Sequence, residues 1–355
     1  MRLDQAHLDA LRCAVDAGTF EAAARRLHVT PSAVSQRIRA LEESVGRVLL
    51  RRSKPIEATA SGVSLLRLAR QIDLLSDDVA REFGAELGGA DGFGGDGSSG
   101  AGSSGVDDAD APLIRLPIAV NADSLATWIL PALAPLTGRI AFDLHREDET
   151  HTDSLLRDGT VMAAITAVAR PVQGCSSVLL GNMRYRPMMS RAFAERWFPA
   201  DGAADAADAA DAVGAAGAAG AARAAGAAGT VNATDAVTAE RLGRAPVVVF
   251  DARDDLQHAY LRRRAEELGA GRELVPPLQY VPGSTDFVRA VRLGFGWGMV
   301  PDLQREPGDG LVELDPGAVV DVPLHWQQWQ LHTPSLDLVT RTLRAAASRA
   351  LVPHP

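Results

Sequence analysis

The segment from Thr30 to Val45 constrains the fold most strongly, because it has the marks of one helix with two different faces. Thr30 can cap the helix through its hydroxyl group, and Pro31 suits the first helical position. Apolar residues recur three or four positions apart, as a buried helix face requires: Val34, Ile38, Leu41 and Val45. The other face carries hydroxyl, amide and guanidinium groups that can read the base edges of DNA: Ser32, Ser35, Gln36 and Arg39.

Two shorter helices are expected before this segment. Leu8, Leu11 and Val15 form one helical stripe, and Thr19 can cap a second helix that runs to about Leu27. The turn at 28–29 then leads into the helix that begins at residue 31. Two helices joined by a tight turn, the second one polar on its outer face, are typical of a helix-turn-helix, although three helices of an ordinary bundle would show the same periodicity.

The charge distribution favours the DNA-binding interpretation. Residues 1–54 contain ten Arg and Lys against six Asp and Glu, which gives +4, so the remainder of this chain of net charge −9 carries −13. A basic, non-helical segment, 49–55, follows the third helix and ends at a proline. It contains Arg51, Arg52 and Lys54, the only lysine of the protein, and it suits a wing that lies along the DNA backbone.

A long helix is predicted from Thr59. Its apolar residues are spaced three, four, three and four apart, at Leu65, Leu68, Ile72, Leu75 and Val79. Such a heptad seam is typical of a dimer interface, and roughly 25 helical residues would extend about 37 Å. A dimer would present two recognition helices to a two-fold operator.

The N-terminal region resembles the LysR-type transcriptional regulators. The resemblance covers residues 31–42, followed by Gly46, Leu49, Leu50, Arg52, Thr59 and Gly62. It implies that Pro31, Ser32, Ser35 and Gln36 lie against bases. It also implies that Thr30, Arg37 and Arg39 lie near phosphates or neighbouring bases, and that Arg51 or Arg52 belongs to the wing.

The remaining chain alternates short apolar strands with helices, which predicts an α/β domain of two lobes like the type 2 periplasmic binding proteins. We expect a winged helix-turn-helix domain at 1–58, a dimerising linker helix at 59–87, a flexible Gly/Ser-rich linker at 88–111 and an effector-binding domain at 112–355. Lobe I would comprise 112–186 and 323–355, and lobe II 187–322, with a low-complexity insertion at 201–229.

A strand at 116–120 followed by a helix at 124–136 would place the turn around Asn121, Asp123 and Ser124 at the ligand end of a parallel sheet. Amides and a hydroxyl group at a helix N-terminus favour a carboxylate, although Asp123 and Ser124 could simply cap the helix. The run 118–135, together with 147–150 and 245–251, resembles the ArgP/LysG branch of the LysR-type family. That resemblance implies a regulator that senses lysine or arginine and controls export of these amino acids.

Three consecutive acidic residues, Glu147, Asp148 and Glu149, follow the second strand of this domain. Their carboxylates could hold an ammonium or guanidinium group, or could form a solvated acidic loop. If the strand continued, His145, Glu147, Glu149 and His151 would share one face, which would permit a metal site, but the spacing matches no zinc motif. Further candidates for effector contact are Thr166 at the end of the third strand and Ser284, Thr285 and Asp286 at the start of a later helix.

These features predict a cytoplasmic, sequence-specific transcriptional regulator without catalytic residues, metal or cofactor. Its expected partners are double-stranded DNA, a basic amino acid, RNA polymerase and a second copy of itself in a homodimer or homotetramer. The sequence shows no signal peptide, no membrane span, no nucleophile elbow and no P-loop. A DNA-architecture or replication-initiation inhibitor without an effector, and an amino-acid-binding enzyme fused to a DNA module, remain alternatives. Cys13 lies within the first predicted helix and is expected to be a core residue, and Cys175 has no nearby His or Lys in the sequence, so a redox role is not favoured for either.

Overall fold

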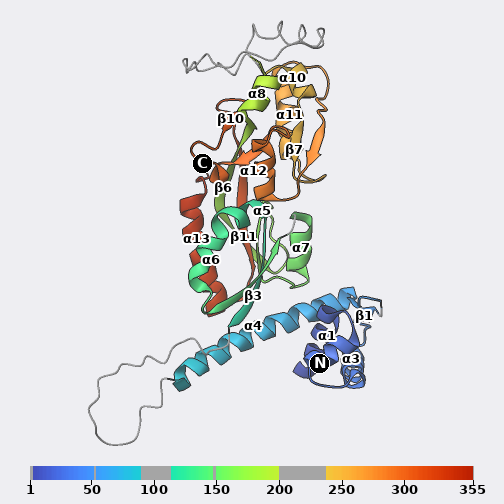
Figure 1. Cartoon of the computed structure of the whole chain (residues 1–355). Helices are drawn as coiled ribbons and strands as arrows, with labels where there is room; N and C mark the ends of the chain where they lie inside the picture. The colour runs from blue at the N-terminus through green and yellow to red at the C-terminus, as the bar shows by residue number, and fades with distance from the viewer. Residues whose placement is uncertain (1–2, 52, 89–112, 147–148, 200–236, 355) are drawn as a thin grey trace, which may run out of the picture. The chain divides into compact units, whose positions relative to one another are not determined.

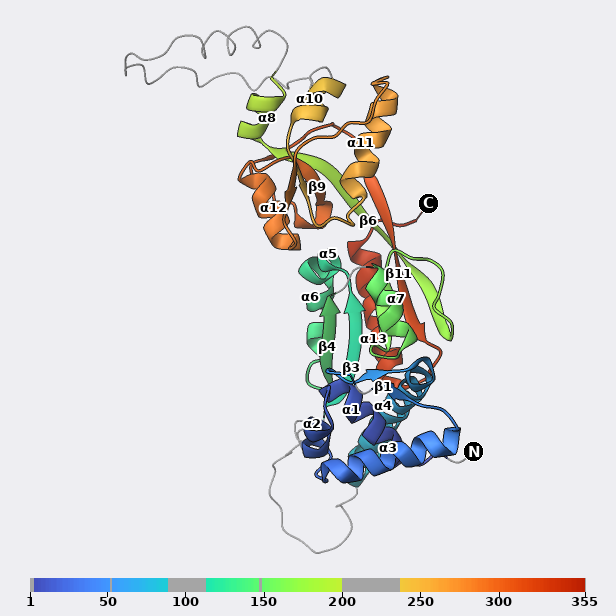
Figure 2. The same cartoon turned by 90° about the vertical axis from the view of Figure 1, so that its right-hand side faces the viewer.

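The computed structural model describes residues 3–51, 53–88, 113–146, 149–199 and 237–354. Of the linker expected at 88–111, residues 89–111 lie outside these residues, as does the insertion expected at 201–229. The chain forms two compact units, the first comprising 1–181 and 323–350 and the second comprising 182–322 and 351–355. Figures 1 and 2 show the elements of each unit.

The first unit begins with the predicted helix-turn-helix. Its helices are α1 (Gln5–Ala17), α2 (Phe20–Arg26) and α3 (Pro31–Val45). Each begins at a side chain that accepts backbone N–H groups: Asp4 for α1, Thr19 for α2 and Thr30 for α3. The expected caps at Thr19 and Thr30 are therefore confirmed, and the turn between α2 and α3 contains His28 with φ 54°.

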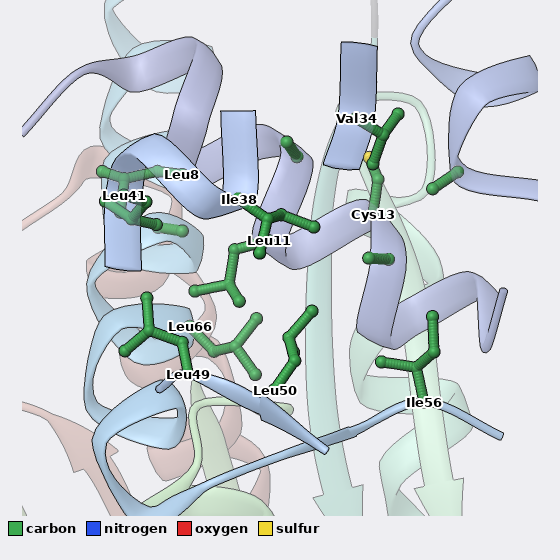
Figure 3. Close-up of a cluster of buried hydrophobic side chains, with 14 of the residues drawn as sticks. Leu8, Leu11, Cys13, Val34, Ile38, Leu41, Leu49, Leu50, Ile56 and Leu66 are labelled. Carbon is green, nitrogen blue, oxygen red and sulfur yellow. The ribbon is translucent and has the colours of Figure 1, made fainter. Parts of the chain in front are cut away.

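The core of this DNA-binding part is built by all three helices and by residues further along the chain. Leu11, Val34 and Leu41 are almost completely buried, as the spacing of apolar residues predicts. Leu49, Leu50 and Ile56 close the cluster from the wing, and Leu66 closes it from the next helix (Figure 3). The recognition helix therefore owes its position to burial of one continuous apolar face.

The wing is a two-stranded antiparallel ribbon of β1 (Leu50–Arg51) and β2 (Glu57–Ala58). Three polar contacts fix its connections. Glu42 Oε1 accepts the backbone N–H of Leu49 at 2.8 Å, and the hydroxyl group of Thr59 donates to the carbonyl of Val48 at 2.8 Å. Thr59 also accepts the backbone N–H of Gly62 at 3.1 Å, at the start of the next helix.

The linker helix α4 (Ala60–Gly88) contributes some apolar residues to the core of the DNA-binding part and leaves others exposed. Leu65 and Leu66 are buried in the core of the DNA-binding part, and Leu68 and Ile72 pack against that core. Part of the predicted seam is thus used within the chain, because a period of three and four marks a buried face without identifying what buries it. Its role in a dimer stays a prediction. Leu75 and Val79 are exposed by 39% and 48%, whereas Leu68 and Ile72 are half-buried.

The α/β part of the first unit is a sheet with the strand order β11-β5-β3-β4. Its strands are β3 (Ile114–Val120), β4 (Ile140–Arg146), β5 (Ala163–Thr166) and β11 (Val320–Trp329). Parallel pairing joins β3 to β4 and to β5, whereas β11 pairs with β5 in the antiparallel sense. The parallel βαβαβ pattern predicted from the sequence is thus present.

Helices cover both faces of this sheet. The run that follows β3 packs against α13 (Pro334–Ala350) on one face, and α7 (Glu149–Arg157) lies over the other face (Figure 1). The run after β3 consists of α5 (Ala122–Ser124), the π-helical turn η2 (Leu125–Ile129), α6 (Leu130–Leu133) and the 3-10 turn η3 (Ala134–Leu136). Pro131 lacks the N–H that a regular helix would donate to the carbonyl of Thr127. This missing hydrogen bond explains why the helix widens into a π-helical turn just before the proline.

The second unit contains the far half of β6 (Cys175–Ser190), which pairs with β9 (Gly298–Pro301) and β10 (Leu311–Glu313). Residues 187–189 lie near the end of this long strand. This unit also contains a parallel pair of strands, β7 (Val247–Val249) and β8 (Leu278–Tyr280). Its helical segments are α8 (Arg191–Trp197), α10 (Ala239–Arg244), α11 (Leu256–Glu267), α12 (Ser284–Arg292) and the 3-10 turn η4 (Asp302–Gln304).

The close approach of α4 to the wing gives a test of this packing. A Cβ atom added at Gly62 would overlap the carbonyl oxygen of Leu49, so we expect Gly62→Ala to lower the free energy of unfolding by about 1–3 kcal/mol. The same change in an ordinary helix interior would raise it by about 0.5–1 kcal/mol. Guanidinium unfolding followed by circular dichroism measures the difference. Gly138→Ala is the matched control, since no atom lies within 4 Å of its added Cβ.

Candidate functional site

The face of α3 opposite the core is open to solvent. Val34 and Ile38 point into the core, whereas the predicted DNA-contacting side chains lie on the outside of the helix or at its margins. Thr30, Pro31, Ser32, Gln36 and Arg39 are exposed, and Ser35 and Arg37 are half-buried. The structure therefore brings these seven residues together on one accessible surface.

The N-terminus of α3 is rigidly built. Thr30 Oγ1 accepts the backbone N–H of Ala33 at 3.2 Å and lies 2.9 Å from Ser32 Oγ. Gln36 stands one turn further along the helix and makes no hydrogen bond to any residue that the structure describes. Its amide is thus free to donate and accept at once, which is the pattern that the major-groove edge of adenine presents.

The wing adds positive charge beside this helix. Arg51 is exposed on β1 and pairs in register with Glu57, and Lys54 is exposed in the turn that follows β1. Both can neutralise DNA phosphates without reading sequence. Arg52, the other candidate from the sequence, lies outside the described residues.

A hollow of about 240 Å³ separates the recognition helix from the start of the wing. Ser35 and Ile38 of α3 form one wall, and Val48 and Leu50 form another. Because α3 and the wing are not packed together there, the hydroxyl group of Ser35 keeps access to solvent and to DNA.

The turn after β3 buries polar atoms without partners. Ser124 is completely buried, and neither its Oγ nor Asn121 Oδ1 has a hydrogen-bond partner among the described residues. The helical run begins at Ala122 rather than at the predicted Ser124, and Asn121, the residue before it, makes no side-chain cap. The simple capping interpretation of Ser124 is therefore wrong. A buried hydroxyl group and a buried amide oxygen without partners are costly unless a ligand or water completes them.

The acidic segment lies between β4 and α7. Glu147 and Asp148 fall outside the described residues, whereas Glu149 is the first residue of α7. Since Glu149 and His151 belong to a helix, strand alternation cannot align them with His145, and that argument for a metal site is wrong. The described residues contain no group of three or more side chains able to hold a metal ion.

The remaining effector candidates occupy the positions expected from the sequence. Thr166 ends β5, is buried, and accepts the backbone N–H of Val168 at 3.1 Å. In the second unit, Ser284, Thr285 and Asp286 form the first turn of α12. Ser284 is buried and accepts a hydrogen bond from Gln304 Nε2, whereas Thr285 and Asp286 are exposed.

Both thiols are buried and free of disulfides. Desolvation raises the pKa of Cys13, and it raises the pKa of Cys175 to about 11. Thiolate is therefore scarce at neutral pH, so neither cysteine has the properties of a redox sensor.

An exposed recognition helix beside a basic wing, joined by a long helix to α/β lobes, defines a DNA-binding transcriptional regulator. Comparison with known proteins agrees. Residues 6–63 match the family described as bacterial regulatory helix-turn-helix protein, lysR family. The HTH-type transcriptional regulator LysG of Mycobacterium tuberculosis is 37% identical over 349 residues, which cover 98% of this chain and 94% of that protein. The chain belongs to the LysR family.

Two solved structures are similar over nearly the whole chain. ArgP from Mycobacterium tuberculosis is 36% identical with a TM-score of 0.74, covering 99% of this chain and 100% of that one. Full-length LysG from Corynebacterium glutamicum with bound effector Arg is 30% identical with a TM-score of 0.65, with the same coverage. The protein is therefore a LysR-family regulator similar to LysG and ArgP, and not an enzyme.

One group of residues between α4 and the α/β part of the first unit was not predicted from the sequence. Arg70 of α4 contacts Asp16 and Thr160, and Arg67 lies over the ring of Trp329. In the sequence, the only sign of this group is that Arg67 and Arg70 lie three positions apart on the polar side of the predicted linker helix. Such residues are common on any solvated helix.

The free amide of Gln36 gives a direct test of base reading. We expect Gln36→Ala to reduce discrimination between the preferred operator and a single-base variant by about 1–3 kcal/mol. Binding to random DNA should stay unchanged, because phosphate contacts dominate it. Fluorescence anisotropy at fixed salt measures both affinities, with the exposed Glu43→Ala of the same helix as a control. Equal losses on operator and random DNA would refute base reading by Gln36.

Proposed function

We propose that this protein is a cytoplasmic regulator whose control of transcription depends on L-lysine or L-arginine, and that it activates genes for export or metabolism of basic amino acids. In this proposal the recognition helices bind the operator, while the effector domain binds the amino acid and changes how RNA polymerase is engaged. The effector can act only through unequal affinity for two conformations of the regulator. No helix among the described residues is long and apolar enough to cross a membrane.

The observation that carries the proposal is the pair of unpartnered polar atoms after β3. Asn121 Oδ1 and Ser124 Oγ lie at the carboxyl end of a parallel strand, which is where α/β sheets bind ligands. Asn121 can accept from the α-ammonium group of an amino acid, and the Ser124 hydroxyl can donate to its carboxylate. Backbone N–H groups at the start of the helical run at 122–136 favour the same carboxylate.

The chemistry of the effector side chain is supported by two further facts. The similar LysG of Corynebacterium glutamicum has been solved with bound effector Arg. In this chain, Glu147, Asp148 and Glu149 follow β4, the strand that pairs in parallel with β3. Carboxylates at that end of the sheet would pair with the cationic end of lysine or arginine.

We also propose a homodimer through α4. Leu75 and Val79 lie one turn apart and are exposed, while the neighbouring apolar residues of the helix are used within the chain. A second copy of the same helix would cover this strip and present two recognition helices to DNA.

Isothermal titration calorimetry with L-lysine and L-arginine tests the effector directly. We expect saturable binding of at least one of them and no binding of L-glutamate, whose side chain would meet like charge. Absence of heat with both basic amino acids, together with unchanged transcription from a bound promoter, would favour an effector-independent DNA-architecture role instead.

A variant locates the site. Ser124→Ala should weaken amino-acid binding about tenfold, which corresponds to a hydrogen bond to a charged group of the ligand. The replacement leaves a fully buried position almost isosteric, so unfolding temperature should change little. Ser348→Ala, in an exposed position of α13, is the matched control. If both variants bind like the unchanged protein, the effector does not contact Ser124.

The dimer strip has its own test. Leu75→Asp combined with Val79→Asp should convert the dimer into monomer in sedimentation-velocity experiments, because two carboxylates would have to be buried without partners. Ser76→Asp adds a charge at an exposed neighbouring position and should leave the dimer intact. A dimer that survives the double substitution would exclude this strip as the interface.

A further inference from the structure

Arg70 joins three elements of the first unit that lie far apart in sequence. From α4, its guanidinium donates to Asp16 Oδ1 at the end of α1 at 2.6 Å. Its other terminal nitrogen donates to the carbonyl of Asp158 at 3.1 Å and to Thr160 Oγ1 at 3.0 Å. The side chain of Arg70 is 15% exposed, and those of Asp16 and Asp158 are 30% and 34% exposed.

The turn that receives Arg70 rests directly on α4. Gly159 has φ +73°, and a Cβ atom added there would lie 3.0 Å from the Cα of Arg67. The guanidinium of Arg67 stacks on Trp329 of the sheet, 4.9 Å from the ring centroid. The contact between α4 and this turn is therefore close-packed and not a loose surface pair.

The same turn is the direct continuation of α7. This helix begins at Glu149, beside the acidic segment, and ends at Arg157, one residue before Asp158. Asp158 Oδ1 accepts the backbone N–H of Thr160 at 2.9 Å, which fixes the turn to the end of the helix. A displacement of α7 along its axis would thus move the two oxygen atoms that hold Arg70.

We propose that Arg70 is the positioning residue that couples the effector site to the DNA-binding helices, through α7, the 158–160 turn and Asp16 of α1. The assignment of the effector site to the neighbourhood of α7 rests on the proposed function. The coupling itself rests on the contacts of Arg70. Since coupling of binding free energies is reciprocal, DNA binding would change the affinity for the effector by the same factor. In this proposal the change passes through the 158–160 turn.

The structure offers a matched control pair between the same two helices. Arg12 Nε of α1 lies 2.7 Å from Asp73 Oδ2 of α4, and both side chains are about one-third exposed or less. This pair fixes α1 to α4 in the same way as Asp16 and Arg70 do. It has no recorded contact with the α7 turn among the described residues, so it isolates the contribution of that turn.

The first experiment measures coupling in the full-length protein. The DNA probe is the tightest-binding duplex selected from a random pool, and its Kd is measured with and without saturating L-arginine or L-lysine. In Arg70→Ala, we expect the ratio of the two Kd values to fall to within about twofold of one. Arg12→Ala should keep the ratio of the unchanged protein. Thr160→Val removes one of the two hydrogen bonds between Arg70 and the turn and leaves the carbonyl of Asp158 in place, so it should move the ratio in the same direction as Arg70→Ala but by less.

A second measurement does not need the effector. Amide hydrogen exchange of residues 158–161 should slow by at least threefold when DNA binds. This response should disappear in Arg70→Ala and weaken in Thr160→Val, which keeps the hydrogen bond to the carbonyl of Asp158. Arg70→Lys keeps a positive charge opposite Asp16, but a single ammonium group cannot reach both Asp16 and the 158–160 turn. This variant should therefore keep the unfolding temperature of the unchanged protein and still lack the exchange response to DNA.

The outcomes separate the two proposals. If the unchanged protein binds neither basic amino acid, the proposed effector is wrong, and the exchange response to DNA still decides the role of Arg70. If Arg70→Ala keeps the response to DNA, or if the unchanged protein shows none, the coupling role is overturned. A loss of unfolding temperature in Arg70→Ala equal to that in Arg12→Ala, with both responses intact, would assign Arg70 a structural role only.

Discussion

The burial of α4 on two sides at once is the constraint on which the first unit depends. One side of the helix carries Leu66 and Ala69 into the core that supports the recognition helix, and burying a leucine of this kind contributes about 1.5–3 kcal/mol. Another side carries Leu74 and Asp78, which are also buried. Asp78 accepts a hydrogen bond from Ser335 at the start of α13. The linker helix is therefore part of both the DNA-binding core and the α/β part, and not a free spacer.

Local chemistry made the DNA-binding part predictable from the sequence. A cap such as Thr30 acts on the next three residues, and the stripe from Val34 to Leu41 lies within one helix, so both signals are complete in a short segment. The signature residues Glu42 and Gly62 have structural roles in the turns of the wing. The sequence resemblance included them without showing why they are needed.

The effector region was less predictable because its signals depend on distant parts of the chain. Strand alternation through residue 149 failed, since α7 begins there and replaces a period of two by one of 3.6. The helix after β3 was predicted to start at Ser124 but starts at Ala122, and the hydroxyl group of Ser124 is buried without a partner among the described residues. Arg70 carries only a weak local signal, because its partners are 54 and 88 to 90 positions away.

The chain passes from one unit to the other within β6 and within β11, and again before its last residues, where Asn182 and Val352 exchange backbone hydrogen bonds. Vectorial synthesis on the ribosome gives this order a consequence. Among the described residues, the core of the DNA-binding part extends no further along the chain than Ile72, so it can form while most of the chain is still untranslated. Both units include residues beyond 320, so each of them is completed late in synthesis. Each nascent molecule therefore acquires its DNA-binding core long before the remainder of either unit is finished.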